Sequence, residues 1–198
     1  MKAEWYGDNR DLVKWGVLLH IARDYSAHRI LQMAYLRPTD WPQLQINGQP
    51  RPIPEPVIRH FRNVFDIRNL SGIPRVEVLG LEFTDRRQYT RAVIEAITSR
   101  PSGEGCIVFL DPDTGLEPRN PTSKHVLLSE LSEVWCHMPP GDVLALYQHQ
   151  TGRNGKPWVE PKRKQFEDNL GLPLGTVKVA SGYSIARDVI FLYCQKQA

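Results

Sequence analysis

The sequence predicts an α/β fold: one three-layer domain with a mostly parallel sheet and an antiparallel hairpin at its C-terminal end. Two observations support this fold class. Apolar segments of strand composition alternate with segments of helical periodicity. The run 105–110 is apolar from Cys106 to Leu110, as expected of a strand that is buried on both faces in the middle of a parallel sheet. Because 198 residues suffice for one well-buried core, we predict a single domain over 1–198.

The elements follow in order along the chain. Helical spacing of apolar residues predicts helices, and short apolar or alternating runs predict strands. We expect helices over 12–24, 57–70, 83–99 and 129–137, and strands over 29–36, 75–81, 105–110, 142–153, 177–180 and 189–194. Six prolines between 38 and 56 predict an ordered surface loop or a lid, and cations around an aromatic residue predict a basic loop over about 152–165.

Composition indicates which partners and which cellular compartment are compatible with the sequence. A net charge of +3 and a pI near 8.8 permit a nucleic-acid partner without requiring one. The three cysteines have no metal-like spacing and fit buried thiols of a cytosolic protein. There is no signal-peptide pattern and no apolar run long enough to span a membrane, so we expect a cytoplasmic protein.

Three carboxylates lie directly after the predicted central strand. Asp111, Asp113 and Glu117 follow the apolar run, and Pro112 ends the strand because it removes a backbone donor. Ligands of open α/β sheets bind at the carboxyl ends of the strands, so a carboxylate cluster there suggests chemistry. A plain turn capped by aspartates is the alternative. We take Asp111 and Asp113 as candidate catalytic residues and Glu117 as a substrate-binding candidate.

Polar residues also end the second buried strand, 142–153. Tyr147, Gln148, His149 and Arg153 lie at or near its end. If this strand neighbours 105–110, these side chains reach the same edge of the sheet as Asp111. His149 is therefore a third catalytic candidate, and the other three are substrate-binding candidates.

The remaining candidates come from the start of the first helix and from the second half of the chain. Asp8 and Asn9 are each either the N-cap of the first helix or ligand-binding residues. Lys14 is either a solvated residue or part of an anion site. Trp158 and Tyr183 are aromatic residues that would stack on a base, with a flexible surface loop as the alternative for the segment around Trp158.

Several motifs resemble those of other families. Gly7-Asp8-Asn9 with Asp11-Leu12-Val13-Lys14 resembles the opening of bacterial rRNA adenine-N6 methyltransferases, and Asp111-Pro112-Asp113 resembles their Asp-Pro-Pro-Tyr motif, which holds the target adenine. The order of elements is similar to that of Rossmann-like methyltransferases and implies that fold. A closer resemblance, over most of the chain, is to an uncharacterised bacterial family with a Phe-x-Asp-Pro-Asp-x-Gly-Leu-Glu stretch and a Tyr-Gln-His strand.

The strand ends also resemble the uracil-DNA glycosylase superfamily, where an Asp-Pro turn and a His-bearing turn form the site. The resemblance implies hydrolysis of an N-glycosidic bond without a cofactor. Asp111 or Asp113 would stabilise the oxocarbenium ion, and His149 or Gln148 would bind the departing base. The glycine-rich cofactor loop that the methyltransferase comparison requires is replaced by Leu36-Arg37-Pro38, which favours an enzyme without a cofactor.

We therefore predict a hydrolase, a DNA glycosylase that flips out and excises a modified or damaged base, in DNA repair or phage defence. DNA is the predicted partner, with RNA as the alternative, and we predict no cofactor and no metal. Three other functions stay open: an S-adenosylmethionine-dependent nucleic-acid methyltransferase, a nuclease with Mg²⁺ on Asp111, Asp113 and Glu117, and a non-catalytic nucleic-acid-binding protein.

Overall fold

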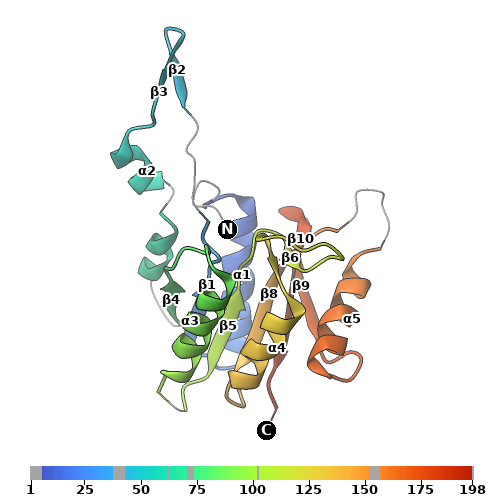
Figure 1. The fold of residues 1–198 in the computed structure, drawn as a ribbon. Helices are drawn as coiled ribbons and strands as arrows, with labels where there is room; N and C mark the ends of the chain where they lie inside the picture. Colours follow the sequence, from blue (N-terminus) through green and yellow to red (C-terminus); the bar gives the residue numbers. More distant parts are fainter. Residues whose placement is uncertain are drawn as a thin grey trace.

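A six-stranded sheet forms the centre of the part of the chain that the computed structural model describes, namely residues 6–37, 43–61, 63–70, 74–101, 103–151 and 157–197. Its strand order is β4-β1-β5-β8-β10-β9 (Figure 1). The bounds are β1 (Arg29–Met33), β4 (Arg75–Leu79), β5 (Cys106–Leu110), β8 (Val143–His149), β9 (Lys178–Gly182) and β10 (Ala186–Gln195). β4, β1, β5 and β8 are parallel, whereas β10 is antiparallel to β8 and β9. The predicted fold class is confirmed.

Helices cover both faces of this sheet. On one face lie α1 (Asn9–Asp24) and the 3₁₀ helix η2 (Val64–Asn69), and on the other lie α3 (Arg86–Thr98), α4 (Leu128–His137) and α5 (Val159–Leu170). In Figure 1, α1 is behind the sheet and α3, α4 and α5 are in front of it. Among the described residues, none of the helices has the length and apolar character needed to cross a bilayer.

The central strand β5 is buried on both faces, as its composition predicts. Ile107 and Phe109 belong to the core under α1, and the edge of Phe109 meets Trp15 of α1 at a centroid distance of 6.4 Å. Cys106, Val108 and Leu110 belong to the core under α3 and α4. This alternation holds the strand in the middle of the sheet and fixes where its polar end emerges.

The chain reverses its direction of travel across the sheet between β1 and β5. From β1 it moves to β4 at the edge, then crosses back through α3 to β5 on the other side of β1, and continues to β8. A crevice outside the strand ends at such a switch point is where open α/β sheets bind their ligands. The fold therefore marks the carboxyl ends of β1 and β5 as the place to look for a site.

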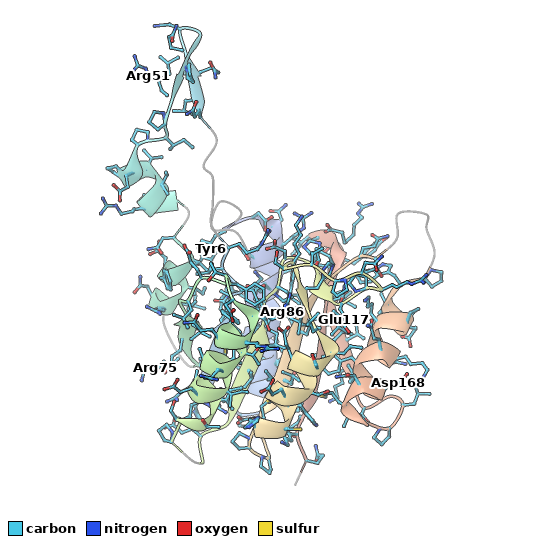
Figure 2. The ribbon with its side chains drawn as sticks, viewed as in Figure 1. Tyr6, Arg51, Arg75, Arg86, Glu117 and Asp168 are labelled. Carbon is cyan, nitrogen blue, oxygen red and sulfur yellow. The ribbon has the colours of Figure 1, made fainter. Side chains whose placement is uncertain are left out.

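The proline-rich segment is more regular than we predicted. Residues 38–42 lie outside the described part of the chain, but β2 (Leu44–Ile46) and β3 (Gln49–Arg51) form an antiparallel hairpin, and α2 (Glu55–Phe61) follows. Asn47 and Gly48 both have positive φ, as a tight two-residue hairpin turn requires. This hairpin projects from the body of the protein, with Arg51 far from Arg86 and Glu117 (Figures 1 and 2).

Two sequence-based boundaries need correction. The helix expected over 57–70 is two shorter helices, α2 and η2. Residues 152–156 of the expected basic loop lie outside the described part, and from Val159 onward the segment is helix α5 instead of loop. The cations of α5 are used locally: Lys162 donates to the Leu116 carbonyl over 3.2 Å, while Arg163 and Lys164 form ion pairs with Glu160 and Asp168.

Candidate functional site

A cavity of about 410 Å³ lies on the α1 side of the sheet, at the carboxyl ends of β5 and β8. It brings together six of the residues singled out from the sequence: Asp8, Lys14, Asp111, Asp113, Tyr147 and His149. The rest of its lining comes from α1 and from the segment after β5: Arg10, Asp11, Pro112, Thr114 and Lys124. We call this cavity the switch pocket, because it adjoins the strand ends where the chain reverses.

The floor of the switch pocket is a buried charge network around Lys14. Its ammonium group lies 2.6 Å from Asp11 Oδ1 and 3.0 Å from Asp111 Oδ2. Gln32 of β1 donates from Nε2 to the same Asp111 oxygen over 2.7 Å. All four side chains are almost fully buried. The solvated position that we weighed for Lys14 is therefore wrong: the lysine joins α1 to the end of β5.

Burial and pairing act in opposite directions on the ionisation of this floor. Burial raises the pKa of Asp111, and the Lys14 ammonium counteracts that rise. Burial would lower the pKa of Lys14, but Asp111 and Asp11 outweigh it, so the pKa of Lys14 is raised. Lys14 thus stays charged and offsets carboxylate charge that would be costly to bury alone.

Asp113 closes the pocket on the side of β1. Its carboxylate forms an ion pair with Arg37, which follows β1, and its side chain is 2% exposed. The pair spans the strand ends at the switch point, so β1 and β5 are joined there by side chains as well as by the sheet.

The opposite wall is lined by β8 and the start of α1, and Asp188 of β10 contacts it without lining the pocket. Tyr147 Oη lies 3.0 Å from His149 Nε2, and His149 Nδ1 lies 3.8 Å from Asp188 Oδ2 of β10. Arg10 donates to that same Asp188 oxygen over 2.7 Å and to Asp8 over 3.2 Å. This wall is only partly buried, with 27% of the His149 side chain and 36% of Asp188 exposed.

The pKa shifts on this wall favour a neutral histidine and a neutral tyrosine. Burial lowers the pKa of His149, and Arg10 adds to that effect. Burial also raises the pKa of Tyr147, and Asp111 adds to it. Burial raises the pKa of Asp188, but the hydrogen bond from Arg10 and the charge of Arg10 together outweigh it, so the pKa is lowered. The wall therefore combines a neutral imidazole with a fixed carboxylate.

The start of α1, with its N-cap, places four pocket residues. The Asp8 carboxylate accepts from the backbone amides of Arg10 and Asp11, which makes it the N-cap, one of the two roles weighed for it. Asn9 is the first helical residue, is exposed and does not line the pocket. Arg10, Asp11 and Lys14 then project from the first two turns toward the sheet edge.

Two other candidates, Gln148 and Glu117, do not line the pocket. Gln148, fully buried, accepts from the Leu116 amide over 2.8 Å and donates to the Thr114 carbonyl over 3.1 Å. It holds β6 (Gly115–Leu116), which pairs with β7 (His125–Val126), against β8. Glu117 accepts through its backbone carbonyl from Gln165 of α5 over 2.9 Å. The geometry gives both residues a role in fixing the segment after β5.

The aromatic candidates lie beside a second cavity, of about 390 Å³. Trp158 and Tyr183 both line it, with Arg187 stacked over the Tyr183 ring at 5.9 Å. Tyr183 is 71% exposed. Neither residue lines the switch pocket, and Arg153 lies outside the described part of the chain.

Sequence reasoning missed Arg10, Asp11, Gln32, Lys124 and Asp188. Asp11 carried a signal, since it stands three residues before Lys14 on a helix. Asp188 carried none, because only the register of β10 beside β8 brings it to His149. As for a nuclease centre, no group of three or more metal-binding side chains is found within the described residues.

Comparisons with known proteins found no matching family model and no matching curated protein. Two similar solved structures are a proposed methyltransferase from Thermobifida fusca YX and human methyltransferase-like protein 13 in complex with SAH. The first has 14% identity and a TM-score of 0.41, covering 96% of this chain and 80% of the other. The second has 13% identity and a TM-score of 0.41, covering 86% and 72%.

These findings correct the functional prediction. Both solved structures are described as methyltransferases, so the assignments as hydrolase, DNA glycosylase and N-glycosidic bond hydrolase are wrong. The site offers a physical reason. Asp111 is shared between Lys14 and Gln32, so its charge is already offset and it would stabilise an oxocarbenium ion poorly.

Proposed function

We propose that the chain is an S-adenosylmethionine-dependent methyltransferase that acts on nucleic acid, with the switch pocket as its reaction site. The observation that carries the proposal is the position and lining of this pocket. It lies beside the strand ends where the chain reverses, and its walls present carboxylates, cations and a tyrosine ring together. A ligand with a sulfonium, an ammonium and a carboxylate group requires such a mixed lining.

The donor set fits the charged end of this cofactor. The Asp8 carboxylate, 39% exposed, and the Tyr147 ring would face the positive groups, because carboxylates and aromatic faces both attract cations. Lys124, held at the rim where its carbonyl accepts from Thr114, would pair with the cofactor's carboxylate. These contacts come from three segments that only the folded chain brings together.

The glycine-rich turn expected for a nucleoside is replaced by an aromatic cluster. Tyr35, after β1, has φ +46° and packs against Phe83 and Tyr89 at centroid distances of 5.1 and 4.8 Å. The Tyr35 amide also donates to Tyr89 Oη over 2.9 Å. The α3 side of the β1 end is therefore filled, and the cofactor would enter from the α1 side.

The bound cofactor would supply an electrophilic methyl group. The residues of this chain would hold the accepting atom in line with that methyl group and exclude water, which accounts for much of the rate enhancement of a transfer reaction. Pro112 and the buried Lys14–Asp111 pair give the pocket a rigid, dry floor for this purpose.

The test is transfer of radiolabelled methyl groups from S-adenosylmethionine to genomic DNA or to total bacterial RNA. We expect label in one of these acceptors with the native chain and much less with Asp8→Asn, which keeps an N-capping side chain but removes its charge. Asp168→Asn makes the same chemical change on exposed α5 and should leave transfer intact. Absence of label from both acceptors would overturn the proposal.

A further inference from the structure

Asp188 does not line the switch pocket, but it faces Nδ1 of His149, the ring nitrogen that Tyr147 does not contact. We infer that Asp188, clamped by Arg10, is a positioning residue that orients His149 as the proton acceptor of the reaction. This inference rests on the proposed function. It adds two residues, one from β10 and one from α1, that the sequence did not point to.

The order of the side chains defines a proton path. Tyr147 and His149 are two residues apart on β8, so both face α1, and both line the switch pocket. Asp188 continues the chain of contacts at His149 Nδ1, and Arg10, which itself lines the switch pocket, pairs with Asp188. The path therefore starts at the pocket and ends at an ion pair between two different elements.

Arg10 fixes Asp188 through two contacts with one carboxylate oxygen. Its Nε and Nη2 atoms donate to Asp188 Oδ2 over 3.2 and 2.7 Å, while Nη1 donates to Asp8. The backbone carbonyl of Asp188 also accepts from the Gln150 amide over 2.8 Å. Asp188 is thus held from α1 and from β8, with the same oxygen turned toward His149 Nδ1.

This arrangement selects one tautomer of a neutral imidazole. The charge of Asp188, whose Oδ2 lies 3.8 Å from Nδ1, favours a proton on that nitrogen, and the lone pair of Nε2 then accepts from the Tyr147 hydroxyl over 3.0 Å. A histidine held in this way by a carboxylate is suited to general base catalysis, because the imidazolium that forms is stabilised by the anion behind it.

The proton step balances as follows for an amine acceptor. With the cofactor bound, the accepting nitrogen would take the methyl group, the cofactor's sulfur would keep the electron pair of the C–S bond, and the nitrogen would release one proton. That proton passes to Tyr147 Oη as the hydroxyl proton of Tyr147 passes to His149 Nε2. The end state is a neutral Tyr147 and a His149 imidazolium paired with Asp188.

The charged groups around His149 come from two elements besides its own strand. Arg10 and Lys14 of α1 favour the neutral imidazole, whereas Asp188 of β10 and Asp8, the N-cap of α1, favour the protonated form. Removing the Asp188 charge should therefore lower the pKa of His149 and release its tautomer. If Asp188 had only a structural role, its removal would leave kcat and the pH dependence of kcat unchanged.

The experiment compares Asp188→Asn with the native chain in three measurements. With the acceptor that takes up labelled methyl groups, we expect kcat to fall about 10²-fold with little change in KM, which is the scale of a lost acid or base function. The acid limb of the pH profile should move to lower pH, and Asp188→Glu should restore part of the rate. Calorimetric affinity for S-adenosylmethionine should not change.

The remaining measurement, by NMR, does not require turnover. The ¹⁵N chemical shifts of His149 should show the Nδ1-protonated tautomer in the native chain, and its pKa should be lower in Asp188→Asn. If the native chain neither binds S-adenosylmethionine nor transfers label, the proposed function fails. The His149 titration then still tests whether Asp188 and His149 interact. An unchanged His149 titration, or an unchanged kcat and pH profile with native cofactor binding, would overturn the role of Asp188.

Discussion

The floor and the wall of the switch pocket use similar residue types in opposite ways. On the floor, Lys14, Asp11 and Asp111 are almost fully buried and satisfied by one another. On the wall, His149 and Asp188 keep about a third of their side chains exposed and meet over 3.8 Å. The comparison teaches that the carboxylate most conspicuous in the sequence is enclosed, whereas one without any sequence signal faces the imidazole.

The largest expected effect is a loss of stability when the floor of the switch pocket is changed. Lys14→Met removes the only cation of the described floor contacts and leaves two carboxylates buried beside each other. Breaking a buried ion pair on one side costs about 3–5 kcal/mol, so we expect the free energy of unfolding to fall by that amount. Urea denaturation followed by circular dichroism measures it.

The matched control for the floor is the double variant Lys14→Met with Asp111→Asn. Neutralising Asp111 removes one of the two stranded charges, so this variant should recover part of the lost stability. If Lys14→Met unfolds at the same urea concentration as the native chain, the floor is not the stabilising region that the comparison requires.

The next largest effect concerns the segment after β5, which Gln148 of β8 holds in place. Gly115 has φ +116°, and a Cβ added there would lie 2.3 Å from Gln148 Oε1. We expect Gly115→Ala to destabilise the chain by about 1–3 kcal/mol, in the range of overpacked interiors. Gly141→Ala is the control, because Gly141 also has positive φ but nothing lies within 4 Å of an added Cβ.

Both variants place an alanine at positive φ, so both include the backbone strain. The difference between their losses of stability therefore measures the clash with Gln148 alone. Thermal unfolding of both variants measures it. Equal losses of stability would mean that Gln148 does not hold the segment after β5 in place, and that the position of Asp113 and Thr114 at the pocket depends on other contacts.

The smallest expected effect is the pH dependence of stability that arises from His149 and Asp188 on the wall. The pKa of His149 is lowered in the folded chain, so its contribution to stability is complete above the unfolded value of about 6.5 and is lost as pH falls through the folded pKa. Asp188, whose pKa is also lowered, adds a further loss below about pH 4. Unfolding free energies measured from pH 7.5 to 5 report the first step.

The variant His149→Gln sharpens this prediction. It removes the titrating group, so its stability should decline less than that of the native chain over the same pH interval. A steeper decline in His149→Gln would mean that the folded chain favours the imidazolium, contrary to the environment formed by Arg10 and Lys14.

Local patterns were enough to predict the sheet and most of its helices. The apolar run of β5, the periodicity of α1 and the Asp8 cap are signals within short windows, and the structure confirms each. The start of α5 was missed because its prolines and cations suggest a loop, whereas Phe166 and Leu170, four residues apart, bury one face.

The site was predictable only where residues adjoin a strand end. Asp111, Asp113, Tyr147 and His149 were found by that rule, and they line one pocket. What each side chain contacts depends on register and on the placement of α1, which no short window encodes. Lys14, expected at the surface, and Asp188, not expected at all, show this limit most clearly.

Calorimetric titration of S-adenosylmethionine into the native chain tests the central claim most directly, with Asp8→Asn and Asp168→Asn as matched variants. We expect one molecule bound per chain, weaker binding to Asp8→Asn and unchanged binding to Asp168→Asn, because only Asp8 lines the switch pocket. No heat of binding to the native chain, or equal binding to all three proteins, would contradict the assignment of this pocket.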